Sequence, residues 1–199
     1  KYPEATRFND QALKIRRDCY GNEHAEVARS LFMQGVLSFM AGSYKEAREY
    51  QIEAQEILQK SLGQNHPKVA NCTFELAKIA YKMGRHKDAE ELHKRALGIR
   101  EQAFSRNHPD IAESLNGIAY LYATQANYDQ AEAYYKRSIG ILEEIYGLEH
   151  PEVASARSNL AWIYFKKGRY DEAKAMYFKA LETREKFLGK DHPEVARKL

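Results

Sequence analysis

Five histidines recur at one fixed spacing, and histidine is the commonest metal ligand in proteins. His24, His66, His108, His150 and His192 each lie 42 residues after the one before. A zinc site needs all its ligands within about 2.0–2.2 Å of one ion. Equivalent positions on successive units are about 10 Å apart, the scale of helix spacing. These side chains cannot converge on one metal, so we predict a capping role for them instead.

The other residue types that support catalysis or bind cofactors show no useful spacing. Cys19 and Cys72 fall at different points of the 42-residue step and have no partner at metal-ligand spacing. No serine lies in a nucleophile elbow, and no glycine-rich loop is present to hold a phosphate group. We therefore predict no catalytic residues, no metal and no cofactor. The unmatched cysteines argue against a disulfide framework and favour a reducing, cytoplasmic compartment.

The histidines stand at the start of a predicted helix in every repeat. Proline follows four of them and alanine follows His24. Proline suits the first helical position because its missing N–H would have no partner there and its φ angle is already helical. An apolar pattern of helical spacing then runs for about 16 residues. A glycine or, once, an alanine marks the predicted end of this helix, at Gly42, Gly84, Ala126 and Gly168.

A second predicted helix of about 19 residues follows each of these ends. It begins at Tyr44, His86, Tyr128 and Tyr170, and it ends near Gly63, Ser105, Gly147 and Gly189. The predicted fold is all-α, with 1–199 forming a single array of helix, tight turn, longer helix and loop. Complete repeats occupy 22–63, 64–105, 106–147 and 148–189. Residues 1–21 match the second helix of a truncated repeat, and 190–199 match the start of another.

Small residues recur where two helices of one repeat should touch. Gly35, Ala77, Ala119 and Ala161 fall midway along the first helices, and Ala47, Ala89, Ala131 and Ala173 open the second helices. Small side chains allow helix axes to approach closely. The aromatic residues that recur beside them, Tyr122, Tyr164, Tyr135 and Tyr177, are predicted to pack in the core. On the lone opening helix, we expect partly uncovered side chains at Ala5, Ala12, Leu13 and Ile15.

Composition excludes two classes of partner. The chain has 199 residues, 44% of them hydrophobic, and a formal net charge of +3. The charge changes sign from one repeat to the next, so no continuous basic surface is available for nucleic acid. No apolar run approaches the roughly 20 residues that cross a bilayer. We therefore expect neither nucleic acid nor a membrane as a partner.

The repeats resemble the tetratricopeptide repeat. In the last repeat the eight signature positions correspond to Arg157, Leu160, Ala161, Tyr164, Ala173, Tyr177, Ala180 and Glu185, of which Arg157 and Glu185 depart from the usual types. The 42-residue period and the segments 147–150, 161–164, 168–173 and 96–101 are similar to the repeats of kinesin light chains and nephrocystin-3-like proteins. The resemblance implies a right-handed α-solenoid of stacked helix-turn-helix units.

The resemblance also implies a concave groove, lined by the first helices, in which a peptide binds. The residues that alignment by the small mid-helix position puts on that face are Phe32, Val36, Phe39, Phe74, Lys78, Tyr81, Lys82, Asn116, Tyr120, Asn159, Trp162, Phe165 and Lys166. Members that bind chaperones clamp a terminal carboxylate with Lys and Asn at the places of Phe32 and Val36, so that clamp is absent. Of the Asn-Asn pairs of kinesin light chains, only Asn116 and Asn159 remain.

These features predict a non-enzymatic scaffold of the cargo-adaptor kind that binds a protein or peptide segment. Lysines and aromatic rings along one face favour a partner with acidic and bulky apolar residues. Two alternatives remain open. The array could be a self-association module, with weak contacts through its ends, or a ligand-sensing segment of a larger signalling protein.

Overall fold

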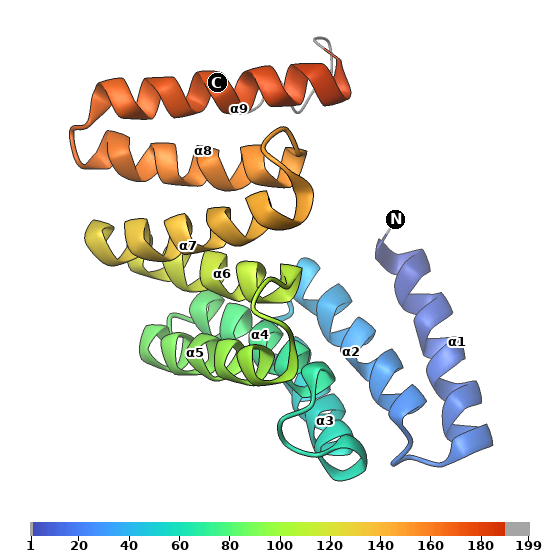
Figure 1. Cartoon of the computed structure of the whole chain (residues 1–199). Coiled ribbons are helices and arrows are strands. Elements are labelled where there is room, and N and C mark those ends of the chain that lie inside the picture. Colours follow the sequence, from blue (N-terminus) through green and yellow to red (C-terminus); the bar gives the residue numbers. More distant parts are fainter. Residues whose placement is uncertain (1, 190–199) are drawn as a thin grey trace. The chain divides into compact units, whose positions relative to one another are not determined.

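The computed structural model describes residues 2–189, and this part of the chain contains nine α-helices and no strand. The chain divides into two compact units, Lys1–Ala103 and Phe104–Leu199. The helices are α1 (Tyr2–Tyr20), α2 (Ala25–Met40), α3 (Tyr44–Leu62), α4 (Pro67–Lys82) and α5 (His86–Ala103) in the first unit, and α6 (Pro109–Thr124), α7 (Tyr128–Tyr146), α8 (Pro151–Lys166) and α9 (Tyr170–Leu188) in the second (Figure 1). The all-α repeat fold is confirmed. His192 and the repeat start predicted at 190–199 lie outside the described residues.

The first helix of each described repeat begins at a histidine cap, as predicted. The Nδ1 atom of His66 accepts a hydrogen bond of 3.1 Å from the backbone N–H of Lys68. His24, His108 and His150 make the same contact. Proline occupies the first turn of α4, α6 and α8. The histidines therefore satisfy backbone N–H groups that a helix start leaves without partners.

Each first helix ends in a turn that sends the chain straight back. Gly42, Gly84 and Gly168 have φ angles of 85°, 76° and 76°, and Ala126 takes the same region with φ 59°. After α2, the N–H of Ser43 binds the Ser38 carbonyl and the N–H of Gly42 binds the Phe39 carbonyl. This is the Schellman pattern, and it satisfies carbonyl groups at the helix end. The predicted glycine breaks are therefore confirmed.

At one position of the loop that follows each second helix, three complete repeats have a glycine and one has a serine. Gly63, Gly147 and Gly189 all have positive φ and cap second helices of 19 residues. Ser105 stands at their place in the second repeat but has no positive φ, and α5 ends at Ala103 after 18 residues. A side chain disfavours the left-handed conformation, so without glycine the helix stops earlier.

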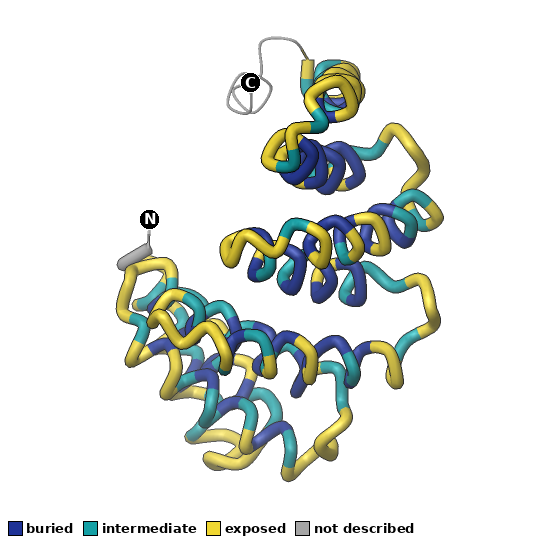
Figure 2. Tube along the Cα trace, turned by 90° about the vertical axis from the view of Figure 1, so that its left-hand side faces the viewer, coloured by how far each residue is buried: buried dark blue, intermediate teal, exposed yellow. Residues whose placement is uncertain are grey.

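Within each unit, consecutive helices pack against one another. Buried residues line the sides of helices that face a neighbour, and exposed residues cover the loops and outer sides (Figure 2). All eight small residues predicted at the helix contacts are buried. On α1, Ile15 is 62% exposed and Ala5 is exposed, as expected. Leu13 corrects the prediction, because its side chain is only 8% exposed and joins the core formed with α2.

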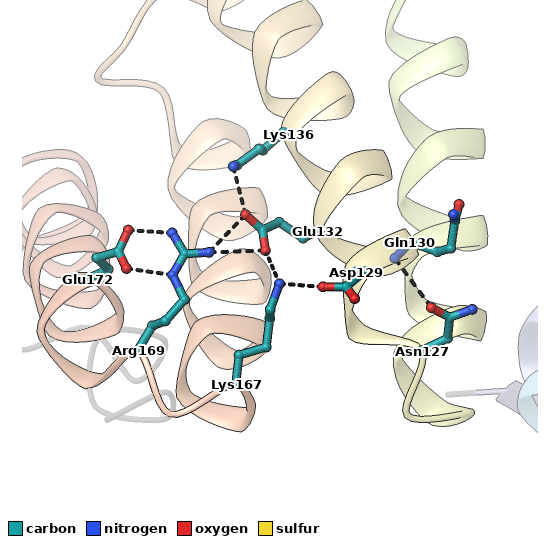
Figure 3. Close-up of polar contacts among 8 residues, drawn as sticks. All are labelled: Asn127, Asp129, Gln130, Glu132, Lys136, Lys167, Arg169 and Glu172. Carbon is teal, nitrogen blue, oxygen red and sulfur yellow. Dashed lines mark hydrogen bonds and ion pairs between the residues drawn. The ribbon is translucent and has the colours of Figure 1, made fainter.

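An ion-pair network connects α7 to the turn between α8 and α9 (Figure 3). Glu132 is almost buried, and its carboxylate accepts hydrogen bonds from Lys167 at 2.7 Å and from Arg169 at 3.0 Å. Lys136 lies 2.7 Å from the same carboxylate. Burial raises the pKa of Glu132, but the bonds from the three cations outweigh burial and lower it to about 2. This carboxylate is therefore charged, and it joins two successive repeats.

Arg157 explains one departure from the repeat signature. Its side chain is 6% exposed, and its guanidinium donates to the Leu148 carbonyl at 2.9 Å and to the Glu143 carboxylate at 2.6 Å. A buried arginine is tolerated when its donors are satisfied in this way. Arg157 therefore fixes the loop between α7 and α8, where the usual apolar residue would only fill space.

We expect Ala131→Leu to destabilise the second unit, because Ala131 is fully buried at the start of α7. Overpacking of this kind costs about 1–3 kcal/mol, which should lower the melting temperature by about 4–8 °C per kcal/mol for a unit of this size. Circular dichroism during heating measures the change. The control is Ala133→Leu on the exposed side of the same helix. Equal melting temperatures for the two variants would contradict the helix contact.

Candidate peptide-binding surfaces

In the first unit, the structure brings Phe39, Phe74 and Lys78 together. The Lys78 Nζ atom lies 5.3 Å from the Phe39 ring centroid and 5.8 Å from that of Phe74. It also pairs with the Glu75 carboxylate at 2.8 Å. A lysine held over two rings and beside a carboxylate has fewer conformations to lose on binding. We call Phe39, Phe74 and Lys78 the Lys78 patch.

The remaining predicted residues of the first unit differ in exposure. Lys82 is exposed, and its Nζ atom lies 5.9 Å from the Tyr81 ring centroid. Val36 is half-buried, and Phe32 packs against the core cluster of the unit. Lys82 is therefore accessible to a partner, whereas Phe32 contributes mainly to the core.

A buried histidine packs against the Phe74 ring of the Lys78 patch. His93 on α5 meets the Phe74 ring edge-on, with ring centroids 5.1 Å apart. The Arg100 guanidinium lies 4.9 Å from the same Phe74 centroid and donates to Asn71 at 2.9 Å. Burial, and then the charges of Lys78 and Arg100, lower the pKa of His93 to about 4. The imidazole is therefore neutral near pH 7.

In the second unit, a cavity of about 680 Å³ opens between α8 and α9. The residues that line it are Ser158, Trp162, Phe165, Tyr170, Ala173, Lys174, Tyr177, Phe178, Leu181 and Arg184. Trp162 is 39% exposed and Phe165 is 52% exposed. Most of the lining is aromatic or aliphatic, and exposed aromatic side chains in a concave site suit a bulky apolar group. We call it the Trp162 cavity.

Neighbouring side chains fix the Trp162 ring. Tyr128 meets it edge-on at a centroid distance of 6.2 Å, and the Lys166 Nζ atom lies 5.3 Å from its centroid. Phe165 packs against Tyr170 at 5.5 Å. The predicted residues Trp162, Phe165 and Lys166 are therefore held close together, with the two rings still accessible at the mouth of the cavity.

Two cationic side chains also line the Trp162 cavity. Arg184 is only 7% exposed, and its guanidinium lies 3.2 Å from the Ser158 hydroxyl, which accepts a hydrogen bond from it. Lys174 is exposed, with its Nζ atom 5.9 Å from the Phe178 ring centroid. An acidic group entering the Trp162 cavity would meet both of these charges, so its chemistry suits an acidic and apolar segment.

Four predicted residues of the second unit do not line the cavity: Lys166, described above, and Tyr120, Asn159 and Asn116. Tyr120 is 51% exposed and lies near Tyr135, whose pKa is raised by burial first and by Tyr120 second. Asn159 is exposed. Asn116 is half-buried, and its Oδ1 atom has no hydrogen-bond partner among residues 2–189.

The contribution of α9 was not predicted from the sequence. Tyr170, Lys174, Phe178, Leu181 and Arg184 come from a second helix, whereas the prediction considered only first helices. One signal was present in the sequence. Phe178 occupies the place held by Ile52, Lys94 and Lys136 in the other repeats, and its side chain is 60% exposed. A large aromatic residue at an otherwise mostly charged surface position indicates a binding surface.

No group of three or more His, Cys, Asp or Glu side chains within residues 2–189 is placed to hold a metal ion. None of the described helices is both long and apolar enough to span a membrane.

The family model of the tetratricopeptide repeat matches residues 35–102, 74–144 and 110–186. Among solved structures, BtubC (BKLC) from P. vanneervenii is 21% identical, with a TM-score of 0.81 over 96% of this chain and 76% of that one. The Podosopora anserina putative kinesin light chain repeats are 22% identical, with a TM-score of 0.73 over 94% and 89%.

A Rap protein complexed with Competence and Sporulation Factor is 21% identical, with a TM-score of 0.71 over 86% of this chain and 50% of that one. At these identities the likeness concerns the fold. No curated protein matched the chain.

We expect acid to weaken the first unit through His93. Its pKa falls from 6.5 to about 4 on folding, so below pH 6.5 the unfolded chain binds the proton more readily than the folded chain. Stability is therefore complete above about pH 6.5 and is lost as the pH falls towards 4. At pH 5 the loss is about 2 kcal/mol. Urea unfolding at pH 7 and pH 5, followed by circular dichroism, measures it.

The control is His93→Gln, because Gln51 occupies the same place in the preceding repeat. All other titrating groups remain in this variant, so its stability should fall less between the two pH values. An identical loss in both proteins would show that His93 does not cause the pH dependence.

Proposed function

The chain belongs to the tetratricopeptide repeat family, and on that premise we propose that it is a non-enzymatic scaffold that binds a peptide segment of a partner protein. Each unit carries one proposed binding surface, the Lys78 patch in the first and the Trp162 cavity in the second. The preferred segment contains bulky apolar residues and acidic residues. The proposed role is that of an adaptor in the cytoplasm, and the two free cysteines, Cys19 and Cys72, support a reducing compartment.

The observation that carries this proposal is the Trp162 cavity. Its aromatic wall offers apolar area, while Arg184, Lys174 and the adjacent Lys166 offer positive charge. Binding anchors are commonly bulky side chains buried in such pockets, with tryptophan and arginine enriched among them. Because Tyr128 and Lys166 hold the Trp162 ring, a ligand would not have to order it.

The similar structures add support of a general kind. The Rap protein, of similar fold, was solved in complex with a second molecule, the Competence and Sporulation Factor. Two of the similar structures are described as putative kinesin light chain repeats. The same helical architecture is therefore used by at least one protein that binds another molecule.

Self-association is the second candidate function, and α9 provides the observation that favours it. Tyr170, Phe178 and Phe187 are each at least 60% exposed on this helix. Exposed apolar surface of this kind can bind another copy of the chain. Light scattering at two protein concentrations separates the candidates, because the molar mass rises with concentration only for a self-associating chain.

The Trp162 cavity can be tested directly because Trp162 is the single tryptophan of the chain. Peptides selected from a random displayed library, and synthesised without tryptophan, should change its fluorescence on binding. We expect Trp162→Ala to weaken binding by about 2 kcal/mol, or roughly 30-fold. Phe187→Ala removes another exposed ring and should leave the affinity unchanged. Peptides that bind the chain and both variants equally would place the site elsewhere.

For the Lys78 patch, we expect Lys78→Gln with Lys82→Gln to slow association with the same acidic peptides. The effect should be larger at low salt, because exposed charges are screened beyond about 10 Å at 0.1 M salt. Stopped-flow fluorescence at two salt concentrations measures the association rate. If the rate and its salt dependence match those of the parent chain, the Lys78 patch takes no part in binding.

A further inference from the structure

One position of the repeat is filled by a tyrosine in the second unit. Tyr164 on α8 is 5% exposed, and the Arg169 guanidinium lies 4.0 Å from its ring centroid. The Lys136 Nζ atom lies 5.9 Å from the same centroid. Glu132 binds both of these cations, as Figure 3 shows. An aromatic ring and a carboxylate thus occupy this place together, surrounded by cations.

The equivalent position in the first unit lies 84 residues earlier and is open. Ala80 replaces Tyr164, and a cavity of about 360 Å³ lies beside it, lined by residues of α3, α4 and α5. Arg85 corresponds to Arg169. Because alanine has no ring, the space that Tyr164 fills in the second unit is left empty in the first. We call it the Ala80 cavity.

The first unit also lacks the carboxylate that Glu132 provides beside Tyr164 in the second unit. Arg48 occupies the position of Glu132, and it lines the Ala80 cavity together with Arg85 and Arg95. All three arginines are exposed. Arg85 pairs with Asp88, as Arg169 pairs with Glu172. Within residues 2–189, no acidic side chain forms an ion pair with Arg48 or Arg95.

The floor of the Ala80 cavity is apolar. Ile52, Leu76 and Leu92 line it together with Ala80. Water gains few hydrogen bonds on such a floor, whereas an aromatic ring buries apolar area there and can stack against a guanidinium. The floor therefore favours a ring, and the rim favours an anion.

The charged side chains that line the Ala80 cavity indicate which anion it can bind. Asp88 and Glu91 also line the Ala80 cavity, so three arginines face two acids. This balance leaves a small positive excess, which suits a single carboxylate. A doubly charged phosphate would be repelled by the two acids and would be better served by a purely basic site.

We propose that the Ala80 cavity binds an aromatic side chain together with a neighbouring carboxylate from a partner protein. The ring takes the place that Tyr164 fills in the second unit, and it stacks beside Arg85. The carboxylate pairs with Arg48, and Arg95 adds positive charge beside it. This site uses no residue of the Lys78 patch or the Trp162 cavity, so it stands or falls independently of the proposed function.

The test uses three short probes and the full chain. The first is the dipeptide acetyl-Glu-Tyr amide, the second replaces Glu with Gln, and the third replaces Tyr with Ala. Titration is followed by the backbone amide shifts of residues 48, 80, 85 and 95 in nitrogen-15 NMR spectra. At about 10 mM, tenfold above a Kd of about 1 mM typical of so small a ligand, the first probe should shift these amides. The other two should bind at least about threefold more weakly.

Variants assign the effect to the Ala80 cavity. Arg48→Gln should weaken the first probe at least about threefold, and Ala80→Tyr should abolish its binding by filling the cavity. Lys179→Gln is the matched control. Lys179 is the counterpart of Arg95 in the second unit, where Tyr164 fills the equivalent space, and its loss changes the net charge by the same amount. If Ala80→Tyr fails to fold, Arg48→Gln and Arg95→Gln at exposed positions carry the test.

Three results would overturn the proposal. The first is that none of the four amides shifts with the first probe at about 10 mM. The second is equal binding of the three probes, because neither the ring nor the charge would then be recognised. The third is equal loss of affinity in Arg48→Gln and Lys179→Gln, which would indicate attraction to the overall charge alone.

Discussion

The structure depends on one backbone constraint, the left-handed residue that follows each first helix. A chain that must reverse within three residues needs a positive φ angle there, and glycine meets this at Gly42, Gly84 and Gly168. Ala126 adopts the same conformation at a cost of about 1–2 kcal/mol. The reversal makes the two helices of a repeat antiparallel neighbours. Only then can the small residues of the two helices meet and the apolar sides be buried.

A shared backbone leaves room for different chemistry at equivalent places. One position of the second helix holds Gln51, His93, Tyr135 and Tyr177 in the four repeats, and the first three are buried. Gln51 donates to the Phe32 carbonyl at 3.0 Å, whereas His93 packs against Phe74. These residues fill the same space with different polarity. The repeat therefore fixes where a side chain lies, and the side chain decides what the adjacent surface can bind.

Several cations of this chain are held in place by the fold. Arg157, Arg100 and Arg184 are each at most 7% exposed, and each donates to a neighbouring side chain. A satisfied guanidinium keeps one orientation, which reduces the entropy lost when an acidic ligand arrives. Arg48 and Lys82, in contrast, are exposed. Arg184 therefore serves both the fold and the proposed binding surface, whereas Arg48 and Lys82 lie where a partner can reach them.

The sequence by itself determined the local structure of this protein, because its signals act over a few residues. Histidine caps, first-turn prolines and glycine turns each involve contacts of two to five residues along the chain, and within residues 2–189 their positions were predicted correctly. The predicted exposure of Leu13 was wrong, because a neighbouring helix buries it. The Trp162 cavity, the Glu132 network and the Ala80 cavity were not predicted.

Those three features share one cause. Each combines side chains from different helices, such as Glu132 with Arg169, which lie 37 residues apart. Whether such residues meet depends on helix packing and side-chain rotamers, and neither is encoded in the local pattern. The tertiary structure alone decided that Tyr164 fills one place of the repeat and that Ala80 leaves its counterpart open.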